Sequence, residues 1–242
     1  DSDEPSIYPT TPLEAKGCED PRIVPFEGSY YIFYSAYDGT RARVAVAKTT
    51  DFECYCKLGV IGHFTWDKDA FVFPERINGK VAFVHRIEPN IQIDYFDSVS
   101  DLLDPRSWDG YEKKVESSTV LRRTFDWEKR KIGGGVPPIK TDEGWILIYH
   151  GVDSQRKYHV GVALLDLDNP SVVKARLPYP VLSPKTDYET VGHYQGCVFP
   201  QGAYVRNREL YVSYGAADEN VAIATVNLDE LVDELVKYRV NE

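Results

Sequence analysis

The sequence lacks methionine, long apolar runs and any block of basic residues. No stretch of about 18 consecutive apolar residues occurs, so we expect no membrane-spanning helix. The net charge of −10 leaves no basic cluster to displace counterions from phosphates, so we expect no nucleic-acid partner. Because no residue is methionine and the first is Asp1, we expect the natural protein to hold residues that these 242 do not include.

Cysteine is scarce, and the four cysteines do not have the spacing of a zinc site. They are Cys18, Cys54, Cys56 and Cys197. Cys54 and Cys56 are separated by one residue, which is too close for an unstrained disulfide. The sequence therefore predicts reduced thiols in a cytoplasmic protein, with no metal site.

Aromatic residues are abundant, with 17 Tyr, 10 Phe and 4 Trp. Such a composition is typical of β-structure and also of sugar binding, because a ring can stack on the C–H face of a pyranose. Packing between strands explains most of these rings without any ligand.

Four segments share one order of features, which indicates an internal repeat. They read EDPRIVPFEGSYYIFYSAYDG, VFPERINGKVAFVHR, GVPPIKTDEGWILIYHGV and VFPQGAYVRNRELYVSYGAAD. Each has a proline near its start, a short β-branched run, a turn and an aromatic-rich strand. The predicted turns are Gly28, Asn78-Gly79, Gly144 and Arg206-Asn207-Arg208.

A third strand follows each predicted hairpin, at residues 43–49, 90–96, 158–167 and 220–228. The repeated prolines Pro21, Pro74, Pro138 and Pro200 lie 53, 64 and 62 residues apart. A unit of this length with three or four short strands is typical of a propeller blade, and the repeated order favours a propeller over a β-sandwich. Only the tail at 228–238 has helical spacing. We therefore predict a single all-β propeller domain over 1–242 with a short C-terminal helix.

The innermost strands of a propeller line a central funnel, so polar residues at the blade heads should converge there. The candidates are Asp20, Arg22, Lys68, Asp69, His85, Arg86, Lys131, His150 and Asp218. Each has an ordinary alternative: the Asp-Pro-Arg turn can be local ion pairing, and a lone His at a strand end is commonly structural. Taken together, Lys68, Arg86, Lys131 and His150 would form a site for a dianion in an otherwise acidic protein.

The motifs GCEDPRI, KDAFVFPERINGK, HRIEPNIQI, KIGGGVPPIKTDEGWILIYHGV, GVALLDLDNP and YGAAD resemble glycoside hydrolase family 130. This family contains β-mannoside phosphorylases and mannosidases on a five-bladed propeller. The resemblance extends from about Gly17 to the C-terminal helix. It implies five blades here, although the stretch before Gly17 is too short for a complete first blade, so we expect a truncated N-terminal blade.

The resemblance also implies roles for particular residues. Asp20 would be the general acid, its proton reaching the glycosidic oxygen through a hydroxyl of the mannosyl unit. Arg86, Lys131 and His150 would bind phosphate. Lys68 falls where many members have Arg, which keeps the charge but loses the bidentate fork. The candidates for sugar contact are Arg22, His85, Tyr149, His193, Tyr194 and Asp218, although Tyr149 fits a hairpin core equally well.

Phosphorolysis needs one acid and a set of cations, whereas inverting hydrolysis needs a second carboxylate to activate water. The cationic set therefore favours a phosphorylase that uses inorganic phosphate as co-substrate and no cofactor. The resemblance implies a β-1,2- or β-1,4-linked mannoside as its substrate. A hydrolase on the same fold and a non-catalytic carbohydrate-binding propeller are the alternatives. A homo-oligomer stays open.

Overall fold

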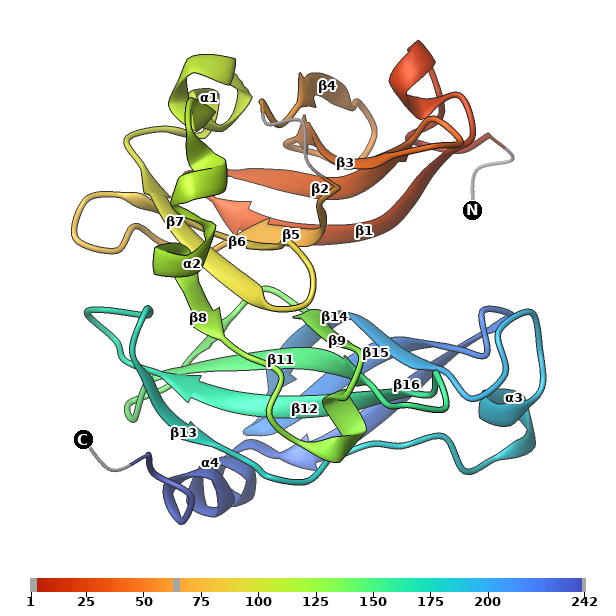
Figure 1. Cartoon of the computed structure of the whole chain (residues 1–242), viewed down its shortest axis with the longest axis vertical. Helices are drawn as coiled ribbons and strands as arrows, with labels where there is room; N and C mark the ends of the chain where they lie inside the picture. Colours follow the sequence, from red (N-terminus) through yellow and green to blue (C-terminus); the bar gives the residue numbers. More distant parts are fainter. Residues whose placement is uncertain (1–3, 63–65, 241–242) are drawn as a thin grey trace. The chain divides into compact units, whose positions relative to one another are not determined.

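The computed structural model describes residues 4–62 and 66–240, and most of these residues lie in or between antiparallel β-strands (Figure 1). The chain divides into two compact units. The first unit comprises the described residues up to 87 together with 92–118, and the second comprises 88–91 together with the described residues from 119 onward.

The first unit contains two sheets whose strands pair in chain order. One sheet is formed by β1 (Gly17–Phe26), β2 (Ser29–Tyr37), β3 (Ala42–Thr49) and β4 (Cys56–Val60). The other contains β5 (Lys68–Val72), β6 (Val81–Arg86) and β7 (Ile91–Phe96). Short helical segments precede β1 and follow β7, namely η1 (Pro12–Glu14), α1 (Val99–Leu103), η2 (Pro105–Trp108), η3 (Tyr111–Lys113) and α2 (Val115–Ser118). Buried rings of Phe33, Phe83 and Trp108 are part of its core.

The second unit also contains two sheets. One holds β9 (Lys131–Gly134), β10 (Ile139–Lys140), β11 (Trp145–Val152), β12 (Tyr158–Leu165) and β13 (Val173–Arg176), with β9 and β10 both pairing with β11. The other holds β14 (Val198–Arg206), β15 (Glu209–Ala216) and β16 (Asn220–Asn227). The remaining elements are β8 (Thr119–Leu121), η4 (Asp126–Glu128), α3 (Asp187–Thr190) and α4 (Leu228–Val236).

The predicted hairpin turns are confirmed. Gly28, Asn78 and Gly79 have φ of 72°, 50° and 79°, so each turn uses residues that tolerate the left-handed region. Asn207 adopts φ 53° in the turn between β14 and β15. The predicted third strands correspond to β3, β7, β12 and β16. This order of strands in each sheet is the plan of propeller blades, and the chain is an all-β, propeller-like protein with a few helices.

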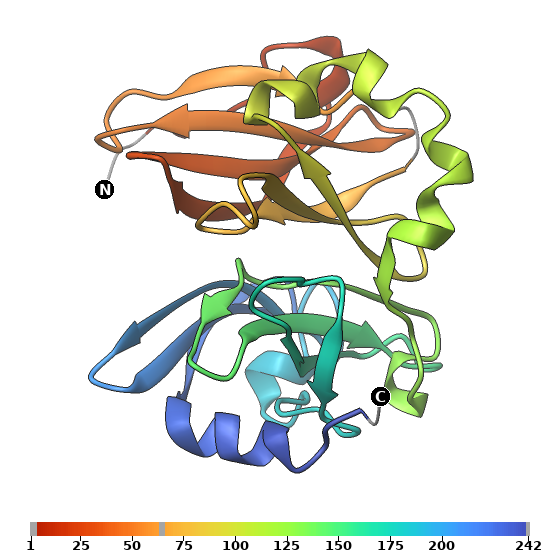
Figure 2. The same cartoon turned by 90° about the vertical axis from the view of Figure 1, so that its left-hand side faces the viewer.

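The predicted C-terminal helix is α4, which contacts β12, β13 and β16 (Figure 2). The side chain of Asn227 caps it by accepting hydrogen bonds from the backbone N–H groups of Asp229 and Glu230, at 3.0 and 3.2 Å. Leu231 and Leu235 are buried in the core that these strands share. The prediction that only this tail is helical was wrong, because α1, α2 and α3 also form. None exceeds five residues, too few to show a helical period.

A buried pair of an aromatic side chain and a carboxylate recurs in the sheets. Tyr34, Tyr149 and Tyr214 lie on the middle strands β2, β11 and β15, and they donate hydrogen bonds to Glu14, Glu128 and Glu189 at 2.7, 2.7 and 2.8 Å. Each glutamate precedes the first strand of its own sheet and also accepts backbone N–H bonds at a turn. Each pair therefore fixes the segment that enters a sheet to the middle of that sheet.

Among residues 4–62 and 66–240, no helix is long and apolar enough to cross a bilayer. All four cysteines are free thiols, as the sequence predicted.

Candidate active site

Two aspartates of the first unit occupy equivalent breaks in the β-ladder. The pairing of β1 with β2 shifts register between Glu19 and Arg22, and the pairing of β5 with β6 shifts between Lys68 and Phe71. Asp20 and Asp69 lie in these bulges with φ of 54° and 57°. A bulge turns its side chain away from the regular alternation, and Asp is among the residues that tolerate positive φ.

Asp20, the predicted acid, forms an ion pair with Lys68, one of the predicted phosphate ligands. Its Oδ2 lies 3.0 Å from Nζ of Lys68, and Oε2 of Glu19 lies 3.5 Å from the same nitrogen. The side chains of Asp20 and Lys68 are 24% and 20% exposed, so a small molecule can reach both. Burial by itself lowers the pKa of Lys68, but the charges of Asp20 and Asp69 outweigh it and raise that pKa above its usual value. Lys68 is therefore a fixed positive charge beside the predicted acid.

Asp69 joins two buried guanidinium groups. Its Oδ1 lies 3.3 Å from Arg22 and its Oδ2 lies 3.2 Å from Arg86. Arg22 is anchored further by a 2.6 Å hydrogen bond from its guanidinium to the carbonyl oxygen of Asp20. All three side chains are at most 4% exposed. The arrangement connects the bulge of β1 to the end of β6, so Asp20 and Arg86 are held by one ion-paired cluster.

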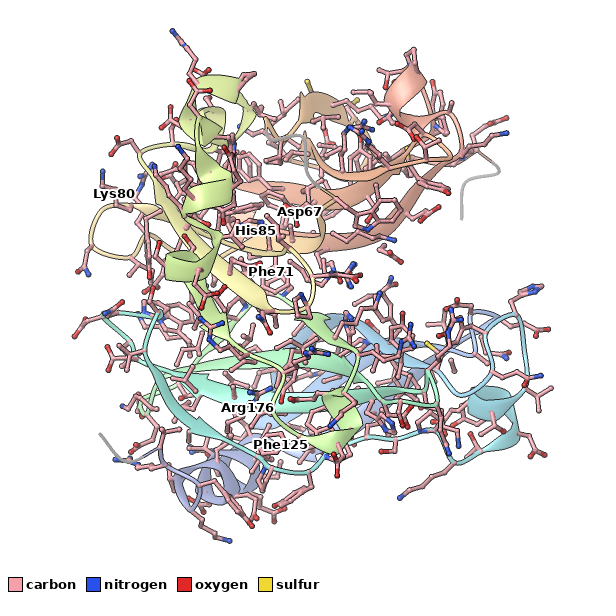
Figure 3. The ribbon with its side chains drawn as sticks, in the orientation of Figure 1. Asp67, Phe71, Lys80, His85, Phe125 and Arg176 are labelled. Carbon is pink, nitrogen blue, oxygen red and sulfur yellow. The ribbon has the colours of Figure 1, made fainter. Side chains whose placement is uncertain are left out.

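His85 lies beside Arg86 on β6 and is fully buried between two carboxylates. Its Nδ1 is 2.9 Å from Oδ2 of Asp67, and its Nε2 is 3.0 Å from Oδ2 of Asp94. The hydroxyl of Tyr111 lies 2.8 Å from Nε2 and donates to Asp94. Figure 3 shows His85 and Asp67 lying close together in this unit. These contacts fit a positioning role better than the predicted contact with sugar.

The charge state of His85 follows from these neighbours. Burial alone would lower the pKa of the ring, but Asp67 and Asp94 outweigh burial and raise the pKa to about 9. Burial also raises the pKa of Asp94, yet the hydrogen bond from His85 reverses this and lowers it overall. At neutral pH the ring is therefore an imidazolium that donates from both nitrogens.

Lys131 lines a cavity of about 360 Å³ in the second unit. The cavity is lined by Glu88, Arg123, Lys129, Arg130, Lys131, Val152, Arg156, Tyr158 and Tyr194. Five of these nine residues are Lys or Arg and one is Glu, so the cavity is strongly cationic within a chain of net charge −10. Nζ of Lys131 lies 3.0 Å from Oε1 of Glu88. Such a site favours an anion.

Two further predicted residues of the second unit are fully buried. His150 packs against the rings of Phe199 and Tyr158, at centroid distances of 4.8 and 5.5 Å. Tyr149 is bonded to Glu128 and Arg176, and the guanidinium of Arg176 lies over the ring of Tyr149 at 5.1 Å. Figure 3 shows Arg176 next to Phe125, whose ring it also covers at 5.1 Å. This is the hairpin-core role that the sequence left open for Tyr149.

The remaining predicted residues lie at surface loops of the second unit. Tyr194 borders the cationic cavity and donates a 2.9 Å hydrogen bond to the carbonyl of Arg156. His193 is exposed beside it, and Asp218 is exposed in the turn between β15 and β16 with φ of 53°.

The structure thus joins the predicted residues of the first unit in one cluster. In the second unit it brings Lys131 and Tyr194 to one cavity and places Tyr149 elsewhere, with Glu128 and Arg176. Convergence of all of them on a single pocket stays a prediction.

Sequence reasoning missed Asp67 and Asp94 as members of the site, whereas Asp69 was among its candidates beside Lys68. Asp67 and Asp69 flank Lys68, and this acidic–basic–acidic triplet had an ordinary explanation as surface charge. Both aspartates are in fact buried, at 1% and 4% exposure. The usable signal was a carboxylate 18–25 residues before an aromatic or His on a middle strand, which recurs in all four sheets.

Comparison with known proteins gives consistent results. The chain is 36% identical over 233 residues to 1,2-beta-oligomannan phosphorylase of Thermoanaerobacter sp. (strain X514), covering 95% of this chain and 74% of that protein. It is 38% identical over 232 residues to beta-1,2-mannobiose phosphorylase of the same organism, covering 95% and 73%.

The solved structure of beta-1,2-mannobiose phosphorylase from Listeria innocua, in complex with beta-1,2-mannobiose, matches with a TM-score of 0.84 and 30% identity. The match covers 97% of this chain and 65% of that structure, so this chain spans less than two thirds of that relative. A family model described as beta-1,4-mannooligosaccharide phosphorylase matches residues 2–237. The chain therefore belongs to glycoside hydrolase family 130.

Proposed function

We propose that the protein is an inverting glycoside phosphorylase that cleaves a β-mannoside with inorganic phosphate and releases α-mannose 1-phosphate. Membership of family 130 supports this assignment, as do relatives named as mannoside phosphorylases. The observation that carries it is the pairing of Asp20 with Lys68 at 3.0 Å, which puts a proton-transfer group and an anion ligand side by side.

The proposed reaction uses one carboxyl group and no activated water. A phosphate oxygen attacks the anomeric carbon from the face opposite the leaving group, and the C–O bond to the shortened sugar breaks with inversion. Asp20 supplies the proton that the departing oxygen needs, through a hydroxyl of the mannosyl unit. Phosphate is already an anionic nucleophile, so the protein's task is to hold it against the anomeric carbon with fixed cations.

Phosphate binding and proton delivery are coupled through Lys68 in this scheme. Without ligand, the ammonium group of Lys68 pairs with Asp20. A phosphate dianion competes for the same ammonium group, so phosphate binding would draw Lys68 away from Asp20. Arg86, held in place by Asp69, is the second proposed phosphate ligand of the first unit.

Lys131 and His150 are the proposed phosphate ligands of the second unit. The cationic lining of the cavity beside Lys131 supports its role. His193, Tyr194 and Asp218 are proposed as sugar contacts, because they lie at loops rather than in a sheet core. Arg22, His85 and Tyr149 bond to buried protein groups, and we assign them to holding the site in shape.

We assign the β-1,2 linkage, because the two relatives above at 36% and 38% identity are named for β-1,2-mannosides. A five-bladed ring is supported by the exposed apolar residues Val221 and Ile223 on β16, which are 84% and 62% exposed and suit cover by another blade. The four free thiols favour a reducing, cytoplasmic compartment. A homo-oligomer is compatible with these features.

The test incubates the full-length protein with β-1,2-mannobiose, with and without phosphate, and measures mannose 1-phosphate and free mannose. The proposal expects mannose 1-phosphate only when phosphate is present. Free mannose without phosphate would indicate a hydrolase, and sugar binding without either product would indicate a binding module. Either of these results overturns the phosphorylase assignment.

Asp20→Asn should abolish turnover while leaving the thermal midpoint nearly unchanged. Glu19→Gln is the matched control, because Glu19 is the adjacent carboxylate and touches the same lysine at a longer distance, 3.5 Å. It should keep most of the activity. Wild-type rates in Asp20→Asn, or equal losses in both variants, would remove Asp20 from the acid role.

A further inference from the structure

The sheet containing β5 and β6 departs from the repeated aromatic–carboxylate pair. Three sheets use a Tyr that donates to a Glu, whereas this sheet uses His85 and Asp67 in the corresponding places. The strand pairing on either side of each bulge places His85 opposite the bulge at Asp69. Tyr34 lies opposite the bulge at Asp20 in the same way. Among the sheets that the structure describes, the one with a His in this place is the sheet that carries Arg86 and Lys68.

The replacement changes what the buried group can bond. A tyrosine hydroxyl donates one hydrogen bond, whereas an imidazolium donates one from each nitrogen. His85 uses both, contacting Asp67 before β5 on one side and Asp94 on β7 on the other. Tyr111 of η3 and Ser118 of α2 also donate to Asp94. His85 therefore connects the segment before β5 with β7, and β5 and β7 are the strands on either side of its own.

Asp67 transmits this contact to Arg86. Its Oδ2 faces His85, while its Oδ1 accepts a 3.0 Å hydrogen bond from the backbone N–H of Arg86. Asp67 is also the immediate neighbour of Lys68. If His85 is removed, the carboxylate of Asp67 loses the hydrogen bond from Nδ1 and is held less firmly. The backbone at Arg86 and the position of Lys68 at the start of β5 are then less restrained.

We infer that His85 is a positioning residue for the phosphate subsite, acting through Asp67 on the backbone of Arg86 and on Lys68. This inference rests on the proposed phosphorylase function. His85 touches neither phosphate nor sugar in this role, since Asp67 occupies Nδ1 and Asp94 and Tyr111 occupy Nε2. Its removal should weaken phosphate binding while leaving the chemistry of the bound complex largely intact.

The test compares His85→Tyr and His85→Gln in the full-length protein with wild type. His85→Tyr installs the residue that the other three sheets use at this place, so it has a precedent for folding in this protein. Both variants should raise KM for phosphate about tenfold, the effect of one lost hydrogen bond to a charged group, with kcat changed less than about threefold. The dissociation constant of inorganic phosphate, measured by calorimetry without sugar, should rise in parallel.

Tyr111→Phe gives a milder perturbation. It removes one hydroxyl at Nε2 of His85 and leaves the ring packed on Trp108, at a centroid distance of 4.9 Å. It should raise phosphate KM about two- to threefold. If the His85 variants do not fold, this variant decides the question, because wild-type phosphate KM in a folded Tyr111→Phe protein would overturn the inference.

Tyr214→Phe is the matched control, since it removes the hydroxyl of the equivalent pair with Glu189 in a sheet without proposed phosphate ligands. It should lower thermal stability without moving phosphate KM. If it raises phosphate KM as much as His85→Tyr, the effect is general loosening and the inference fails. If the wild-type protein has no phosphate-dependent activity, the proposed function itself is refuted. If the wild type is active and the His85 variants keep its KM for phosphate, only this inference is refuted.

Discussion

Raising the pH from 6.5 to 9.5 should destabilise the first unit, because it removes the proton from most His85 side chains. The ordinary pKa of a histidine is 6.5, and Asp67 and Asp94 raise that of His85 to about 9 despite burial. When the pKa of such a group is higher in the folded than in the unfolded chain, its contribution to stability is fully present at pH values below its pKa in the unfolded chain. That contribution is lost as the pH rises through the folded value.

The magnitude follows from the difference of about 2.5 pH units. At about 1.4 kcal/mol per unit, His85 contributes up to about 3 kcal/mol to the free energy of unfolding at pH 6.5. This contribution should be nearly absent at pH 9.5. It is a large fraction of the 5–15 kcal/mol, roughly, that stabilises a typical domain.

The assay has two parts. Urea unfolding followed by tryptophan fluorescence reports on this region, because the ring of Trp108 lies 5.7 Å from that of His85. Nitrogen NMR of the imidazole ring gives the charge state of His85 directly. The difference in unfolding free energy between wild type and His85→Gln should shrink by about 3 kcal/mol from pH 6.5 to 9.5. A pH-independent difference, or a ring that is neutral at pH 7.5, would refute the reasoning.

Three other changes have expected outcomes. Lys68→Arg keeps the charge and adds a bidentate fork, so the KM for phosphate should fall in steady-state assays. Lys68→Gln should raise this KM at least tenfold, roughly the effect of losing one hydrogen bond to a charged group. Glu128→Gln removes the charged partner of Arg176 inside a core and should lower the free energy of unfolding by about 3–5 kcal/mol. The thermal midpoint should fall by about 10 °C, and an unchanged midpoint would show that the pair does not stabilise the fold. Asn227→Ala removes the cap of α4 and should cost about 1 kcal/mol in urea unfolding, whereas Asn227→Asp should cost almost nothing.

Much of the fold could be predicted because its signals are local. Asn78-Gly79 marks a hairpin by backbone preference alone, and the spacing of Leu231 and Leu235 marks α4 because both face the core. The short helix α1 also had a local signal, since the N–H of Ser98 bonds to Asp101 across a capping box, but its five residues gave no period to support it.

The site was less predictable because burial and partner choice are tertiary properties. Nothing next to His85 in sequence shows that Asp67 and Asp94 enclose it, since they lie 18 and 9 residues away. The same limit applies to Tyr149, which sequence reasoning considered as a sugar contact. Its burial depends on Arg176, 27 residues later in the chain.

The bulges at Asp20 and Asp69 have a consequence for how such a protein can diversify. A bulged residue has no single partner across the ladder, so its side chain leaves the regular alternation of the strand and can pair with groups on other strands. Duplication of a blade copies this permissive position together with its backbone geometry. One copy of the bulged residue, such as Asp20, can then supply a proton donor, while the other copy, Asp69, supplies a counterion. A single substitution at such a position can therefore give the protein a new chemical group at its site.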